Sequence, residues 1–95
     1  PRNAVLHLVG NHPNPFNPQT TVAFDLARGG RVEVGIYDLR GRRVRQLVAG
    51  AMPAGRHTVR WDGRDDGGRA VASGVYLCRL TTPDAGHMRK LTLVR

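Results

Sequence analysis

Apolar and polar residues alternate strictly along two stretches of the chain. Thr20–Leu26 places Val22, Phe24 and Leu26 on one face, and Arg31–Asp38 repeats the pattern with three β-branched residues. A period of two with β-branched residues is typical of a half-buried antiparallel strand. We therefore predict one strand in each stretch, with its apolar face toward a core.

Looser apolar runs predict the remaining strands. They cover Ala4–Val9, Arg42–Ala49, Arg56–Asp62, Val75–Thr82 and His87–Val94. Val75–Thr82 is the most continuously apolar and is expected at the centre of a sheet. Arg42–Ala49 fits neither period, so it is either a bulged strand or a strand that ends in a short helical turn. Ala70–Ala72 is expected to add a short strand stub, and Ala51–Gly55 a loop.

Clusters of Gly, Pro, Asn and Asp separate these stretches and recur roughly every eight to twelve residues. About seven strands at this spacing predict an all-β fold, an immunoglobulin- or fibronectin-type-III-like sandwich of antiparallel strands. The 95 residues suffice for a single domain, residues 1–95, in which residues 1–10 form a linker or an edge strand. The predicted core includes Val22, Phe24, Val32, Val34, Ile36, Val59, Trp61, Tyr76, Cys78, Leu80, Leu91 and Leu93.

Basic residues outnumber acidic ones, and the formal net charge is +8. Such a surface attracts nucleic acid, anionic lipid or anionic polysaccharide. The arginines are spread along the whole chain, which indicates solvated surface charge. The densest group, Arg40, Arg42, Arg43 and Arg45, has no interleaved aromatic residues. We therefore expect weak, salt-sensitive contact with nucleic acid at most, and no specific binding.

The chain lacks the patterns of a membrane segment or a secretion signal. No apolar run approaches the roughly 20 residues that span a bilayer, so no membrane insertion is expected. No charged-then-apolar segment opens the sequence, and a start at Pro1 rather than Met indicates an excised domain or a processed product.

Nucleophiles and histidines form no catalytic pattern. Ser73 lacks a Gly-x-Ser-x-Gly elbow, and Cys78, the only cysteine, alternates with apolar residues as a small core residue does. The histidines lack the spacing of metal ligands; they are His7, His12, His57 and His87. We predict no enzyme activity and no cofactor.

Asp62, Asp65 and Asp66 are the candidate metal ligands of the chain. Three carboxylates with neighbouring glycines can wrap a hard cation such as Ca²⁺. Their spacing departs from that of an EF-hand loop, and Asp beside Gly also shapes tight turns by accepting backbone N–H bonds. The sequence favours the turn and leaves Ca²⁺ binding at Asp62–Gly68 open.

Five short motifs follow one another in order. They are Asn14-Pro15-Phe16-Asn17-Pro18, Tyr37-Asp38-Leu39-Arg40-Gly41-Arg42-Arg43-Val44, Pro53-Ala54-Gly55, Ser73-Gly74-Val75-Tyr76 and the terminal Lys90-Leu91-Thr92-Leu93-Val94-Arg95. Together they resemble the FlgD-like immunoglobulin-type domain and the closely similar C-terminal sorting domain of the bacterial type IX secretion system. The stretch Trp61–Gly68 looks more like the FlgD-like branch than the shorter form in the best-known sorting domains.

The resemblance implies a non-enzymatic C-terminal module of an exported bacterial protein, secreted or at the cell surface. The main expectation is a secretion-sorting and surface-attachment domain whose last strand, Lys90–Arg95, is read by the export machinery. Its partners are then the secretion machinery or an anionic surface polysaccharide. The alternative is a structural self-assembly module, a subunit of an extracellular filament or a hook-cap-like scaffold, whose copies associate through edge strands.

Overall fold

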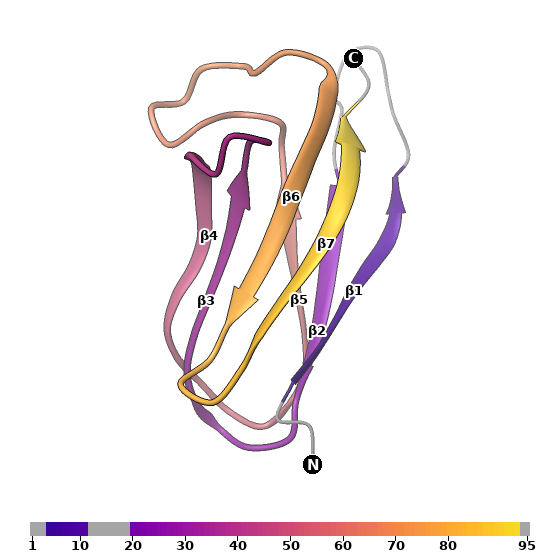
Figure 1. Cartoon of the computed structure of the whole chain (residues 1–95). Helices are drawn as coiled ribbons and strands as arrows, with labels where there is room; N and C mark the ends of the chain where they lie inside the picture. The colour runs from indigo at the N-terminus through magenta and orange to yellow at the C-terminus, as the bar shows by residue number, and fades with distance from the viewer. Residues whose placement is uncertain (1–3, 12–19, 94–95) are drawn as a thin grey trace.

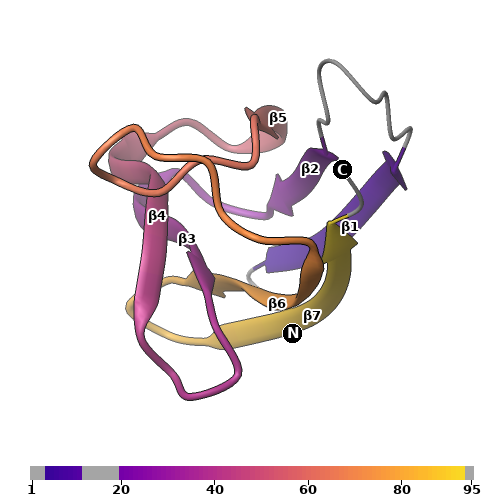
Figure 2. The same cartoon turned by 90° about the horizontal axis from the view of Figure 1, so that it is seen from above.

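The computed structural model describes residues 4–11 and 20–93, and these residues form seven strands in two antiparallel sheets. The strands are β1 (Ala4–Asn11), β2 (Thr20–Leu26), β3 (Gly30–Tyr37), β4 (Arg43–Met52), β5 (Gly55–Trp61), β6 (Gly74–Thr81) and β7 (Gly86–Leu93). One sheet has the order β1-β2-β5 and the other β4-β3-β6-β7. The two sheets lie face to face (Figures 1 and 2), which confirms the predicted all-β sandwich.

The edges of the two sheets meet along both sides of the sandwich. β1 pairs with β2 and also lies beside β7 of the other sheet, while β4 approaches β5 on the opposite side (Figure 2). The segment expected as a linker or an edge strand thus contains an edge strand. No helix in the described part of the chain is long and apolar enough to cross a membrane.

Alternating residues of both sheets fill the space between the layers. Of the twelve side chains predicted for the core, eleven are buried, and Val59 is half-buried against them. Leu26 adds a further buried side chain from β2. The indole of Trp61 on β5 meets the ring of Tyr76 on β6 edge-to-face, with ring centroids 5.4 Å apart. This aromatic pair connects the two sheets and is the geometry that ring quadrupoles favour.

β4 is the strand whose pattern fitted neither period, and the structure explains why. Its pairing with β3 shifts register twice, once past Leu47 and once past Val44. Each shift inserts one extra residue, as a β-bulge does, and both extra side chains pack against the core. The bulged-strand interpretation is therefore confirmed, and the helical-turn alternative is wrong.

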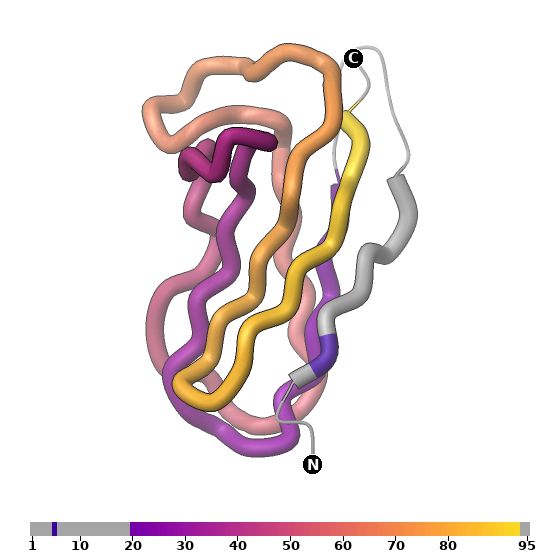
Figure 3. Tube along the Cα trace, viewed as in Figure 1, coloured from indigo at the N-terminus to yellow at the C-terminus, as the bar shows by residue number. Residues whose placement is uncertain are grey.

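Between β5 and β6 the chain crosses one end of the sandwich in a long connection, residues 62–73 (Figure 3). The predicted strand stub at Ala70–Ala72 is wrong, since a single bridge joins Ala70 to Arg64. Most backbone bonds of the connection lie within it, such as Val71 N donating to Gly63 O at 3.0 Å, and one joins it to β4, where Asp66 N donates to Val44 O at 2.8 Å. The predicted loop Ala51–Gly55 is also shorter, because β4 ends at Met52 and β5 begins at Gly55.

Candidate functional site

The motif Tyr37–Val44 forms the tight turn between β3 and β4. The Asp38 carboxylate oxygen Oδ1 accepts hydrogen bonds from the backbone N–H groups of Arg40 (2.9 Å) and Arg42 (3.0 Å). Gly41 has a φ of +87°, a region in which a side chain is strained. The Arg42 backbone bond is the main cause that lowers the pKa of Asp38. Asp38 and Gly41 therefore serve the geometry of the turn.

Two of the candidate metal ligands shape the connection after β5. Asp62 Oδ1 accepts from the backbone N–H of Arg64 at 3.1 Å. Asp65 Oδ1 accepts from the N–H groups of Gly67 (3.0 Å) and Arg69 (2.9 Å). These are the local side-chain-to-backbone bonds that favour Asp in turns.

The third candidate ligand, Asp66, ties this connection to β4. Its Oδ1 accepts from the backbone N–H of Gln46 at 2.9 Å, and its Oδ2 accepts from Arg43 Nε at 3.1 Å. Its own N–H donates to Val44 O at 2.8 Å. The bond from Gln46 is the main cause that lowers the pKa of Asp66. Among the described residues, no three His, Cys, Asp or Glu side chains are grouped to hold a metal ion.

The dense arginine group lies beside these aspartates, and its charge is largely compensated. Arg42 pairs with Asp38, Arg43 with Asp66, and Arg45 with Asp62, at 3.4, 3.1 and 3.2 Å. Three of the four arginines, Arg42, Arg43 and Arg45, thus pair with aspartates of the neighbouring loops, while Arg40 contributes its backbone N–H to the turn.

The motif Ser73–Tyr76 closes the same end of the sandwich. The Tyr76 hydroxyl donates to the backbone oxygen of Ala72 at 2.6 Å, four residues upstream. Trp61, against which Tyr76 packs, donates its indole N–H to Arg64 O at 2.9 Å. A tyrosine that bonds back to the upstream backbone near the start of this strand is a feature of immunoglobulin-type sandwiches. Gly74 and Tyr76 therefore have a structural role that is characteristic of this fold.

The residues predicted for sorting span the end of β7 and the last two residues of the chain. Leu91 and Leu93 on β7 are buried in the core, whereas Lys90 and Thr92 are exposed. Val94 and Arg95 lie outside the described residues, as do Asn14, Pro15, Phe16, Asn17 and Pro18. Half of the described part of this segment thus belongs to the core.

The described nucleophiles and histidines do not converge. Cys78 is fully buried, and desolvation raises the pKa of its thiol to about 12, so the reactive thiolate does not form at neutral pH. His57 on β5 packs against Phe24, and its Nε2 lies 2.8 Å from Pro53 O. His87 is on β7 of the other sheet.

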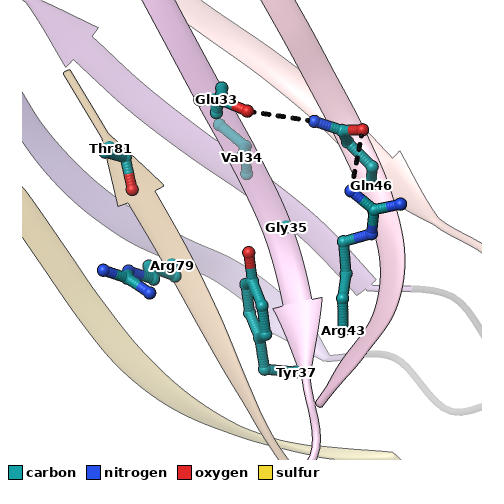
Figure 4. Close-up of a pocket in the computed structure, with 8 residues that line it drawn as sticks. All are labelled: Glu33, Val34, Gly35, Tyr37, Arg43, Gln46, Arg79 and Thr81. Atoms are coloured by element: carbon teal, nitrogen blue, oxygen red, sulfur yellow. Dashed lines mark hydrogen bonds between the residues drawn. The ribbon is translucent and has the colours of Figure 1, made fainter. Parts of the chain in front are cut away.

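A hollow of about 230 Å³ lies on the outer face of the four-stranded sheet, and sequence reasoning missed it. Figure 4 shows it between two rows of side chains, with Tyr37 between them. Its lining is Glu33, Val34, Gly35, Tyr37, Arg43, Gln46, Arg79 and Thr81. In the sequence, the hollow could have been indicated by the outward position of Gly35 between the larger residues Glu33 and Tyr37 on β3. The irregular pattern of Arg42–Ala49 indicated bulges, but it did not show that they bring Arg43 and Gln46 of β4 opposite these residues.

Comparison with known proteins identifies the family of the chain. The family model for the FlgD Ig-like domain matches residues 10–86. The chain belongs to the FlgD Ig-like domain family. Curated relatives are the basal-body rod modification proteins FlgD of Salmonella typhimurium and Salmonella typhi, each 39% identical over 56 residues. This match covers 59% of the chain but 24% of each relative, so the chain spans about a quarter of their length.

Solved structures of FlgD proteins share the fold. The P. aeruginosa structure matches with a TM-score of 0.60 and 27% identity, over 79% of this chain and 59% of that one. The Xanthomonas campestris structure, described as giving insights into the hook capping essential for flagellar assembly, matches with a TM-score of 0.63 and 28% identity. That match covers 96% of this chain and 67% of the other.

These matches overturn the main functional prediction. The chain is not a type IX secretion-sorting and surface-attachment domain, because its family and the relatives above are FlgD. The physical reason for the error lies in the motifs. Asp38, Gly41, Gly74 and Tyr76 build turns and corners of this fold, so they indicate the fold without separating the two functions. The FlgD matches lend no support to the type IX export machinery or to a surface polysaccharide as a partner.

Proposed function

We propose that the chain is a structural module of an exported FlgD-like scaffold protein, a subunit of a hook-cap-like or other extracellular filament assembly. The observation that carries the proposal is the family match over residues 10–86, together with the FlgD relatives. The Xanthomonas campestris protein, whose description concerns hook capping in flagellar assembly, supports a location outside the cell body. The partners would be further copies or other subunits of the same assembly.

A non-enzymatic role is part of this proposal. It is supported by the burial of Cys78 and by the placement of His57 and His87 on different sheets. It is also supported by the use of Asp62, Asp65 and Asp66 as hydrogen-bond acceptors for the backbone. A sandwich of this kind acts through its faces and edges.

Deletion of the module from the gene that encodes it tests the structural role. An in-frame deletion of residues 20–93 is expected to abolish the extracellular filament or hook, counted by electron microscopy, while the shortened protein is still made. A strain with the single change Lys90→Ala, an exposed residue, is the matched control and should assemble normally. Normal filaments in the deletion strain would reject the proposal.

Sedimentation velocity tests self-association directly. The protein that carries the chain is expected to form larger species as its concentration rises from about 1 μM to about 100 μM, the range of moderate affinities. A persistent monomer throughout this range would remove the self-assembly part and leave only assembly with other subunits, which the deletion experiment would still detect.

A further inference from the structure

The hollow on the outer face of the four-stranded sheet presents hydrogen-bond donors that the described residues leave unused. The Tyr37 hydroxyl, the Arg79 guanidinium and the Thr81 hydroxyl line it, and within the described chain none of them makes a hydrogen bond or an ion pair. The Arg79 guanidinium lies over the Tyr37 ring, whose centroid is 6.0 Å from Cζ. These groups are therefore available to an acceptor from outside.

The missing side chain of Gly35 creates the space. An added Cβ at Gly35 would lie 3.0 Å from Cε1 of Tyr37, so even alanine would crowd the ring. In Figure 4, Thr81 and Arg79 lie on β6 on one side, and Glu33, Gln46 and Arg43 form a hydrogen-bonded row on the other. The backbone of Gly35 lies between them and forms the floor.

The charges around the hollow favour a singly charged ligand. Arg43 is already paired with Asp66 at 3.1 Å, and Glu33 accepts a bond from Gln46 at 3.3 Å. The uncompensated cation is then Arg79, whose planar guanidinium matches a carboxylate in two parallel hydrogen bonds. The Glu33 carboxylate repels a multiply charged phosphate chain more than a single carboxylate.

We propose that this hollow binds a carboxylate side chain presented by an acidic protein partner. We take the partner to be a different protein, because each of the seven acidic residues of this chain already accepts a hydrogen bond or forms an ion pair within its own fold. They are Asp25 with Arg56, Glu33 with Gln46, Asp38 with Arg42, Asp62 with Arg45, Asp65 with backbone N–H groups, Asp66 with Arg43, and Asp84 with Arg28. The inference concerns the surface of the folded chain and does not depend on the scaffold role.

Titration of the folded chain with a capped Glu-Gly repeat peptide, followed by ¹H–¹⁵N NMR, tests the site. The peptide is expected to bind with a Kd below about 1 mM and to shift the signals of the Gly35 amide and the Arg79 side chain. The variant R79Q should weaken binding by about fivefold or more, as loss of a charge-assisted hydrogen bond does. The matched control is R60Q, which removes the same charge from an exposed position on β5 of the other sheet and should change the Kd less than twofold.

A second variant, G35A, narrows the hollow at its floor and crowds the Tyr37 ring but leaves every charge in place. It is expected to weaken binding as R79Q does, and its melting temperature shows whether the fold persists. Equal weakening by R79Q and R60Q would reject the site in favour of diffuse attraction. Equal binding of a Gln-Gly peptide, or no binding of the Glu-Gly peptide, would also overturn the proposal. Tighter, Arg79-dependent binding of single-stranded DNA would reassign the hollow to phosphate.

Discussion

At the scale of single residues, Gly41 carries a backbone conformation that other residues resist. Its φ is +87°, and an added Cβ would meet no atom within 4 Å. Gly41→Ala should therefore lower the free energy of unfolding by about 1–2 kcal/mol through backbone strain alone. Urea unfolding measures this change. Gly86→Ala is the control, because its Cβ would make only an ordinary contact at 3.9 Å. Equal effects at both positions would contradict the strain argument.

The Tyr76 hydroxyl is the second residue-scale feature with a measurable effect. Tyr76→Phe keeps the ring against Trp61 but removes the 2.6 Å bond to Ala72 O. The free energy of unfolding should fall by about 1 kcal/mol, the usual net value of a hydrogen bond. Tyr37→Phe is a matched change, since the Tyr37 hydroxyl makes no hydrogen bond within the described chain, and it should have little effect. A neutral Tyr76→Phe variant would argue against a stabilising corner.

The sequence predicts the inward residues well and the outward ones poorly. A period of two is enough to assign Val22 and Phe24 to the core, because burial follows directly from the pleat. The same pattern says only that Gly35 and Arg79 face outward. Whether they line a hollow depends on the neighbouring strand and its register, which belong to tertiary structure.

At the scale of elements, β7 has one face in the core and one in solvent. Leu91→Ala removes a side chain that is 5% exposed and should lower the free energy of unfolding by about 2–4 kcal/mol. Lys90→Ala changes the exposed face and should stay within about 0.5 kcal/mol. Chemical denaturation of the two variants checks the difference. Comparable losses would mean that β7 is not seated as described.

Asp38 and Asp66, which hold the β3–β4 turn and the connection after β5 in place, should make the free energy of unfolding depend on pH. The pKa values of Asp38 and Asp66 are lowered in the fold, chiefly by backbone bonds from Arg42 and Gln46. Their contribution is therefore complete above the unfolded value of about 4 and is lost as the pH falls through the lowered values. Urea unfolding at stepwise pH from about 6 to about 2 should show this decline.

The double variant Asp38→Asn and Asp66→Asn is the control for this prediction. Asn keeps an oxygen that accepts the backbone bonds but does not titrate. Its stability should fall less steeply with acid than that of the unchanged chain. Identical slopes would assign the acid sensitivity to other carboxylates.

Element boundaries show where local patterns stop being informative. The apolar pattern of Arg42–Ala49 fitted neither a strand nor a helix period because of the bulges at Val44 and Leu47. The tie between this strand and Asp66 joins residues 20 and 23 apart in sequence, and no local spacing reveals it. The motifs at Asp38 and Tyr76 predicted the family because they are local, and they misled on function for the same reason.

At the scale of the whole molecule, the formal charge of +8 overstates the open cationic surface near the β3–β4 turn. Arg42, Arg43 and Arg45 are paired there, so DNA should bind weakly, with a Kd above about 1 μM at physiological salt, and more weakly still as salt rises. Fluorescence anisotropy at several salt concentrations measures this. Sub-micromolar binding that is lost when Arg40, Arg42, Arg43 and Arg45 are reversed in charge would contradict it.

The excess of arginines over acidic residues also affects how copies of the chain behave near one another. Each molecule carries a net positive charge of +8, so the copies repel one another within about a Debye length. Low ionic strength should therefore weaken the self-association expected of the chain, although four strands lie at sheet edges. Concentrated salt shortens the range of this electrostatic repulsion, so the ionic strength of the medium controls how readily the copies associate.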